Sequence, residues 1–292
     1  MTEAPVALPK LAFIHVIKAG GTTFREILRT LYGNSFHFCT DPTIPSIQAK
    51  LAKYRAVEFH KLTTPTSNLY IHCDLIGQRR WDLLADRHIF TMFRDPLDHY
   101  LSYYHHVAQR RAAIEPMLGE GRYRFPQSLE EFMSWKYTFN QQLASFVGKL
   151  GDDGYCCTRE DLETAKEMLV QLHIRVGLTE NFAGSMHIFE IATGLQIPGR
   201  LIVNQNSNPN RQAYQTIPED VKQDIRRNSA LDQELYDFGR QLFLRDLALC
   251  GPMPVYCFAA ENATKTAPER PTSPQGILSR LRAALPQAMQ EN

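Results

Sequence analysis

The stretch Leu11–Leu31, LAFIHVIKAGGTTFREILRTL, decides the expected fold. Its first part, LAFIHVI, is a short apolar run between a proline and a lysine, which is typical of a strand buried in a parallel sheet. A sharp turn of small residues follows, at Ala19, Gly20 and Gly21. The next apolar side chains recur at helical spacing, at Phe24, Ile27, Leu28 and Leu31. The stretch therefore predicts a strand, a glycine turn and a helix in succession.

A turn of this kind can hold an anion. The first N–H groups of a helix have no partner within the helix, and the helix dipole favours negative charge beside them. Lys18 adds a positive charge at the strand end, where open α/β sheets bind ligands, and Thr22 and Thr23 add hydroxyls. The P-loop of nucleotide hydrolases has its lysine after the glycines, so the pattern does not predict an ordinary ATPase. Taken alone, the stretch fits an ordinary turn with a solvated lysine equally well.

Composition limits the classes of protein that this chain can represent. With 292 residues, 43% of them hydrophobic, it can form one large α/β domain or two small ones. A net charge of +1 argues against a general binder of nucleic acid, and no apolar run approaches the roughly 20 residues of a membrane span. The N-terminus, MTEAPVALPK, lacks the pattern of a secretory signal. Six scattered cysteines lack metal-ligand spacing, so the expected location is the reducing cytoplasm.

Alternating strand and helix patterns predict an α/β fold with a parallel sheet flanked by helices. Further strands are expected at residues 69–72, 88–93 and 173–177. Helices are expected at residues 47–55, from Pro96, from Ser128, at 139–147 and 161–171, from Leu178 with Thr179 as its cap, and at 218–244. Residues 1–258 are expected to form the domain, and residues 259–292 a linker with a short amphipathic tail.

A second strand–turn–helix pattern occurs at HIFTMFRDPLDHYLSYYHH. Arg94 follows the strand, and Ser102 lies eight residues later on the helix, so both can reach a second anion. Asp95 can orient Arg94 or cap the helix, and an arginine–aspartate pair that only holds the helix terminus is the alternative. Two anion cradles on one sheet suit a nucleoside with phosphate groups at both ends.

These two motifs resemble a known family. FIHVIKAGGTTF is similar to the 5′-phosphosulfate loop, and FRDPLDHYLSYY to the 3′-phosphate motif, of sulfotransferases that use 3′-phosphoadenosine-5′-phosphosulfate (PAPS). The branch with the heparan sulfate 2-O-sulfotransferases and bacterial relatives is the most similar. The resemblance continues through FNQQLASFVG, VGLTENF, NQNSNPNRQ and the segment from Ile217 to Phe243. The chain departs from the family at His99, commonly an arginine, at Ile17, usually a proline, and at Ile71–Gly77, where bacterial members often read GHFPYG.

The resemblance implies a P-loop-like core that transfers a sulfuryl group from PAPS to a hydroxyl of a carbohydrate or small molecule. The other product is 3′-phosphoadenosine-5′-phosphate (PAP), and the family needs no metal. Lys18 would stabilise charge on the leaving phosphate, and His72 would be the base, with His60 and Glu180 as alternatives. The residues that would bind the nucleotide are Lys18, Ala19, Gly20, Gly21, Thr22, Thr23, Arg94, Ser102 and Arg211.

Two other functions fit the sequence. Because of the departures at Ile71–Gly77 and at His99, the chain can instead be a catalytically silent protein that binds PAP or a sulfated ligand. A nucleotide kinase could use the same cradle with magnesium, but no clear carboxylate partner for the metal stands beside the loop. The oligomeric state and the identity of the acceptor cannot be read from the sequence.

Overall fold

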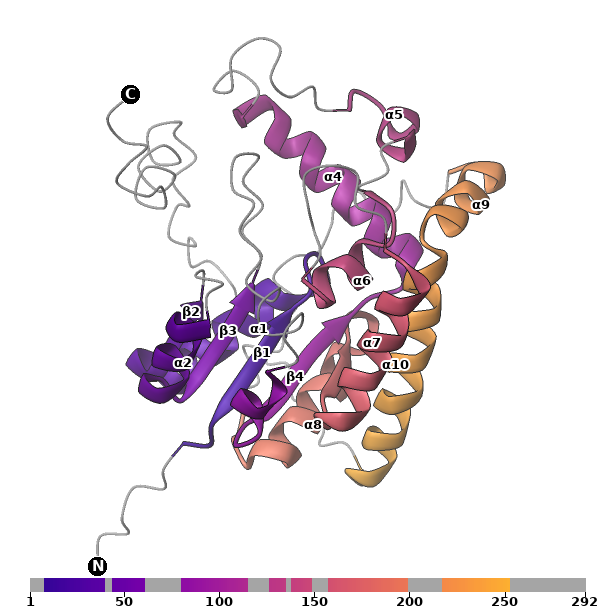
Figure 1. Ribbon diagram of the computed structural model, residues 1–292. Helices are drawn as coiled ribbons and strands as arrows, with labels where there is room; N and C mark the ends of the chain where they lie inside the picture. Colours follow the sequence, from indigo (N-terminus) through magenta and orange to yellow (C-terminus); the bar gives the residue numbers. More distant parts are fainter. Residues whose placement is uncertain are drawn as a thin grey trace, which may run out of the picture.

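Five parallel strands form the sheet at the centre of the protein (Figure 1). The computed structural model describes residues 8–39, 44–60, 80–114, 126–134, 138–148, 157–198 and 217–252. The strands are β1 (Leu11–His15), β2 (Phe36–Cys39), β3 (Ala56–His60), β4 (His88–Phe93) and β5 (Arg175–Leu178). Their order in the sheet is β2-β3-β1-β4-β5, and every pairing is parallel. The predicted α/β class with a parallel sheet is confirmed.

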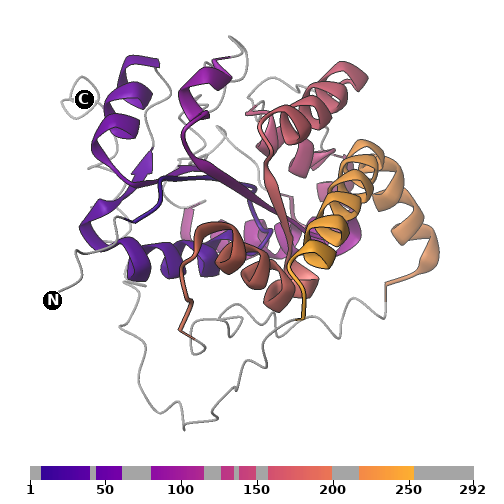
Figure 2. The same cartoon turned by 90° about the horizontal axis from the view of Figure 1, so that it is seen from below.

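Helices cover both faces of the sheet (Figure 2). On one face lie α1 (Gly21–Tyr32) and α8 (Phe182–Thr193), and on the other lie α2 (Ile44–Lys53) and α7 (Arg159–Gln171). The long helix α10 (Ala230–Leu249) packs on β5, α7 and α8. The remaining helices are α4 (Pro96–Ile114), α5 (Leu129–Ser134), α6 (Gln141–Phe146) and α9 (Glu219–Asn228), with short 3-10 turns η1 (Gly33–Ser35), η2 (Trp81–Leu84) and η5 (Thr179–Asn181).

Aromatic packing fixes α1 and α8 against the middle of the sheet. Phe24 of α1 lies 4.7 Å from Phe13 of β1 and 5.2 Å from Phe189 of α8, between ring centroids. Phe189 in turn lies 5.0 Å from Phe90 of β4. All four rings are buried, and each contributes about 1.5–3 kcal/mol relative to an exposed side chain. The packing holds the start of α1 at the end of β1, where the glycine turn lies.

The sheet order places a switch point between β1 and β4. After β1 the chain crosses to β2 on one side of the sheet, whereas after β4 it continues to β5 on the other side. The connections after β1 and β4 therefore leave the sheet in opposite directions. Such a divergence opens a crevice at the carboxyl ends of the two strands, and open α/β sheets bind ligands there. Both sequence motifs follow these two strands, so the fold brings the two expected cradles to one crevice.

Three expectations about local structure were wrong or lie outside the described residues. The sequence reading missed β2 and β3, which are short and carry polar side chains among apolar ones. The strand expected at residues 69–72 lies outside the described residues. The cap of α8 is Asn181 and not Thr179, because Thr179–Asn181 first form a 3-10 turn and the Asn181 side chain accepts from Gly184 N at 3.1 Å.

The helix expected at residues 218–244 is two helices. The break lies at Ser229, whose backbone leaves the helical region, and α9 and α10 meet there. Asn140 from the start of α6 contacts this break, since its side-chain oxygen accepts from the backbone N–H groups of Leu231 and Asp232 at 2.9 and 3.2 Å. Asn140, which is distant in the sequence, therefore caps α10. The residues around Ser229 contain no local pattern that predicts the break.

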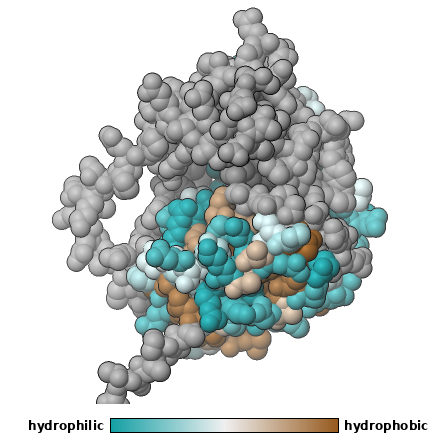
Figure 3. Space-filling view, turned by 60° about the vertical axis from the view of Figure 1, so that its left-hand side comes forward, coloured by the Kyte–Doolittle hydropathy of each residue, from teal (hydrophilic) through white to brown (hydrophobic). Residues whose placement is uncertain are grey.

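On the face drawn in Figure 3, polar and apolar residues of the described part intermix as neighbouring teal and brown patches. Among the residues that the structure describes, none of the helices combines the length and apolarity that crossing a membrane requires.

Candidate functional site

The turn after β1 has a strained backbone. Between His15 and Gly21, two residues adopt left-handed conformations, Lys18 with φ 60° and Gly20 with φ 81°. Gly20 is the N-cap of α1, and its carbonyl accepts from Thr23 N at 3.1 Å. Glycine adopts this conformation freely, whereas for lysine it costs roughly 1–2 kcal/mol. Other groups must therefore hold Lys18 in place.

Contacts from three elements hold the backbone at Ile17 and Lys18. The Ile17 N–H donates to Ser145 Oγ of α6 at 3.2 Å, and the Ile17 carbonyl accepts from His99 Nε2 of α4 at 2.8 Å. The Lys18 carbonyl accepts a longer contact of 3.5 Å from Arg94 Nη1. Both polar groups of the residue before Lys18 are thus satisfied by buried side chains.

His99 performs its role as a neutral group. Burial lowers the pKa of His99 to about 3, and the nearby charges of Arg94 and Lys18 act in the same direction. A neutral imidazole carries one proton, and the bond to the Ile17 carbonyl places it on Nε2. The residue that departs from the family pattern is therefore part of the loop's support.

Arg94 is fixed through its backbone and lies beside the first loop. Gln142 of α6 accepts from Arg94 N at 2.9 Å and donates to Arg94 O at 2.8 Å. The guanidinium reaches Asp98 at 3.8 Å, and its side chain is 15% exposed. Asp95 Oδ1 accepts from Asp98 N at 3.1 Å, which confirms the capping alternative for Asp95. Ser102 is buried two turns further along α4.

The start of α1 fits an anionic group. The Thr23 hydroxyl is buried and has no hydrogen-bond partner among the described residues, so an incoming oxygen would satisfy it. A Cβ at Gly20 would lie 3.4 Å from Thr179 Oγ1, and one at Gly21 would lie 2.1 Å from His15 Nε2. Thr22 is half-buried beside them. The turn therefore combines small residues, a helix N-terminus and an orphaned hydroxyl with the nearby Lys18.

Of the three candidate bases, His60 and Glu180 lie within the described residues. His72 and the nucleotide-binding candidate Arg211 lie outside the described residues. His60 is the last residue of β3, and its Cα is in register with that of His15 at the end of β1. Glu180 lies in η5 and accepts a hydrogen bond from Tyr236 of α10, whose pKa burial and Glu180 both raise. The Glu180 carboxylate thus already accepts a hydrogen bond from the Tyr236 hydroxyl.

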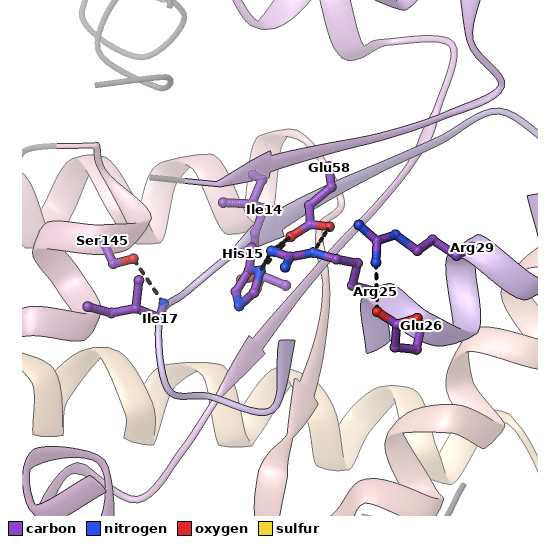
Figure 4. Close-up of polar contacts among 9 residues, drawn as sticks. Ile14, His15, Ile17, Arg25, Glu26, Arg29, Glu58 and Ser145 are labelled. Atoms are coloured by element: carbon purple, nitrogen blue, oxygen red, sulfur yellow. Dashed lines mark hydrogen bonds and ion pairs between the residues drawn. The ribbon is translucent and has the colours of Figure 1, made fainter. Parts of the chain in front are cut away.

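A buried network that the sequence reading missed links β1 and β3 to α1 (Figure 4). His15 Nδ1 is 2.5 Å from Glu58 Oε1, and Arg25 donates to both oxygens of Glu58, from Nε at 2.7 Å and from Nη2 at 2.6 Å. Glu58 is fully buried in β3. We call these three residues the His15 network. Its one sequence signal is Glu58 itself, a carboxylate among the apolar residues of AVEFH.

The electrostatics of the His15 network are consistent with a neutral imidazole. Burial lowers the pKa of His15, and this outweighs the opposite effect of Glu58. Burial acts to raise the pKa of Glu58, but hydrogen bonds from His15 and Arg25 outweigh it and leave that pKa below its ordinary value. The network therefore holds an ionised carboxylate, a guanidinium and a neutral imidazole.

Comparison with known proteins gives one distant relative. The chain is 26% identical over 275 residues to heparan-sulfate 6-O-sulfotransferase 2 of Gallus gallus, and the alignment covers 80% of this chain and 67% of that protein. No family model matches the chain. The similarity supports a relationship with the sulfotransferases, and the α/β sheet is consistent with it.

Proposed function

We propose that the protein is a sulfotransferase that moves a sulfuryl group from PAPS to a hydroxyl of a carbohydrate. The observation that carries the proposal is the meeting of two basic cradles at the β1/β4 switch point, where Arg94 Nη1 lies 3.5 Å from the Lys18 carbonyl. A ligand with anionic groups at both ends of a nucleoside suits this pair. The distant relative, itself named as a sulfotransferase, supports the same reading.

Each cradle receives one end of the nucleotide. Lys18 and the start of α1 hold the 5′-phosphosulfate through a charge, backbone N–H groups and hydroxyls. Arg94 and Ser102 hold the 3′-phosphate, which distinguishes PAPS from ATP. The proposed binding residues are Lys18, Ala19, Gly20, Gly21, Thr22, Thr23, Arg94 and Ser102, with Arg211 outside the described residues.

The chemistry requires a cation at the leaving group and a base at the acceptor. Bound PAPS supplies the sulfuryl group. Lys18 stabilises the negative charge that grows on the phosphate oxygen, and the held backbone around it avoids reorganisation during the reaction. His72 is the proposed base for the acceptor proton. His60 is the alternative, because the end of β3 lies one strand from β1 at the same edge of the sheet.

The proposed acceptor is a hydroxyl of a carbohydrate, and the proposed location is the cytoplasm. The motifs resemble the 2-O branch, whereas the relative is named as a 6-O enzyme, so the proposal names a carbohydrate hydroxyl and no ring position. A reducing cytoplasm is the proposed location, because the six cysteines are scattered without metal-ligand spacing.

A silent PAP-binding protein is the second candidate. It is favoured by His99, because the family's usual arginine would add a positive charge where this chain has a neutral imidazole. The two candidates share the nucleotide site and differ in turnover.

The test measures binding first and turnover second. Calorimetry compares PAP, 5′-AMP and ATP on wild type, on Arg94→Ala and on the control Arg227→Ala, which removes an exposed arginine of α9. We expect selective PAP binding that Arg94→Ala loses and Arg227→Ala keeps. Equal binding of PAP and 5′-AMP contradicts the two-cradle site. Turnover with PAPS and a desulfated heparan chain then favours the enzyme, whereas tight PAP binding without turnover on any carbohydrate favours the silent candidate.

A further inference from the structure

The His15 network lies directly beneath the turn that starts α1. The imidazole projects from the end of β1, Glu58 from β3 and Arg25 from the second turn of α1, so three elements meet at this point (Figure 4). His15 is 3% exposed and Glu58 is fully buried. The Arg25 guanidinium is additionally covered by the Phe38 ring of β2, 4.6 Å from its centroid. The network is therefore largely shielded from solvent.

The imidazole fills the space that a side chain at position 21 would need. A Cβ on Gly21 would lie 2.1 Å from Nε2 and 2.3 Å from Cδ2 of His15. Gly21 is the first residue of α1, so the ring packs directly against the start of the helix. A shift of the ring toward Gly21 would therefore press on the backbone at the start of α1, where the proposed anion binds.

The network also sets the net charge next to the 5′ cradle. A buried carboxylate under an anion site would repel the ligand, but Arg25 binds both oxygens of Glu58 and neutralises it. His15 donates its Nδ1 proton to Glu58, which leaves Nε2 as the ring nitrogen nearest Gly21. Among the described residues, the charged groups that act on the imidazole include Glu58 of β3, Arg25 of α1 and Lys18 of the loop.

We propose that His15 is a positioning residue for the 5′-phosphosulfate, because Glu58 and Arg25 hold its ring in place against Gly21. The proposal rests on the proposed function and deepens it. It gives the 5′ cradle a support in addition to the contacts that Ser145, His99 and Arg94 make with Ile17 and Lys18.

The test uses ligands that separate the two cradles. PAP occupies both, 5′-AMP needs only the 5′ cradle, and 3′-AMP needs only the 3′ cradle. The main variant is His15→Asn, whose side-chain amide can still donate to Glu58 but cannot reach beneath Gly21. The matched control is Glu26→Gln, which breaks an exposed carboxylate–arginine pair with Arg29 on the same helix. Thermal melting checks that both variants fold.

We expect His15→Asn to bind PAP and 5′-AMP about tenfold more weakly, roughly 1.4 kcal/mol, and to bind 3′-AMP within about twofold of wild type. Glu26→Gln should match wild type for all three ligands. An unchanged PAP affinity in folded His15→Asn, or an equal loss for all three ligands, overturns the proposal, since general destabilisation would weaken both cradles alike.

A second measurement separates this inference from the proposed function. Amide NMR shifts of Gly20 and Gly21 are followed while inorganic phosphate is added to wild type and to His15→Asn. If PAP binds without selectivity but phosphate shifts these amides only in wild type, the function fails and the positioning role stands. If phosphate shifts them equally in both proteins, or in neither, the positioning role is overturned.

Discussion

Replacing His99 with glutamine should change how the stability of the protein depends on pH. The His99 side chain is 1% exposed, and burial lowers its pKa to about 3. A glutamine amide can still donate to the Ile17 carbonyl but does not titrate between pH 3 and 7. The comparison of wild type with His99→Gln therefore isolates the titration of one imidazole, because all other ionisable groups are common to both proteins.

The sign follows from proton uptake. An unfolded chain protonates this histidine near pH 6.5, whereas the folded protein does not do so until about pH 3. Between these values the unfolded state binds more protons, so the free energy of unfolding rises with pH and falls on acidification. From pH 6.5 to pH 5 is 1.5 units, and at 1.36 kcal/mol per unit the wild type should lose about 2 kcal/mol relative to the variant.

Urea unfolding followed by circular dichroism at pH 7.5 and pH 5.0 measures this difference. The control is His88→Gln, which removes an exposed histidine at the start of β4 and should follow wild type at both pH values. A wild-type-minus-His99→Gln difference that stays constant within about 0.5 kcal/mol between the two pH values would refute the reasoning, because the imidazole would then titrate alike in both states.

Two further substitutions test the loop and its support, and a third tests the packing of α10 on β4. Lys18→Ala should raise the barrier by about 2.7–4 kcal/mol, and turnover within about tenfold of wild type would contradict its role. Gly21→Ala should destabilise the fold by about 1–3 kcal/mol, because its Cβ would lie 2.1 Å from His15 Nε2; combining it with His15→Ala should recover part of this loss in thermal melts. Gly239→Ala should destabilise the fold by a similar amount, since a Cβ there would lie 2.7 Å from Phe93 Cδ2. An unchanged melting temperature would contradict this prediction, because it would show that α10 shifts to make room for the methyl group.

Local patterns were sufficient to predict the two strand–turn–helix units that carry the proposed cradles. The strand, turn and helix around Lys18 and those around Arg94 each lie within about two dozen residues, and their signals are apolar runs, glycines and a proline at the first helical position. Because both strands belong to one parallel sheet, their carboxyl ends had to share an edge. That β1 and β4 are direct neighbours at a switch point depends on the strand order, and the sequence contains no local signal for it.

The supports of the loop could not be predicted because their partners are far apart in the sequence. Ser145 lies 128 residues from Ile17, His99 lies 82 residues from it, and Glu58 lies 43 residues from His15. In each case the residue type alone fits several roles, and only the folded arrangement selects one. His99 illustrates this, since the sequence identified it only as a departure from the family's arginine.

The energetics of the loop explain why these distant supports are needed. The left-handed conformation of Lys18 costs roughly 1–2 kcal/mol. The bonds from Ile17 to Ser145 and to His99 each contribute about 0.5–1.5 kcal/mol net, so together they match the strain. A neutral donor is well suited to this position, because a buried positive charge at His99 would need a buried partner of its own. The positive charge of the crevice can then come from Lys18 and Arg94, whose side chains remain partly exposed to an incoming anion.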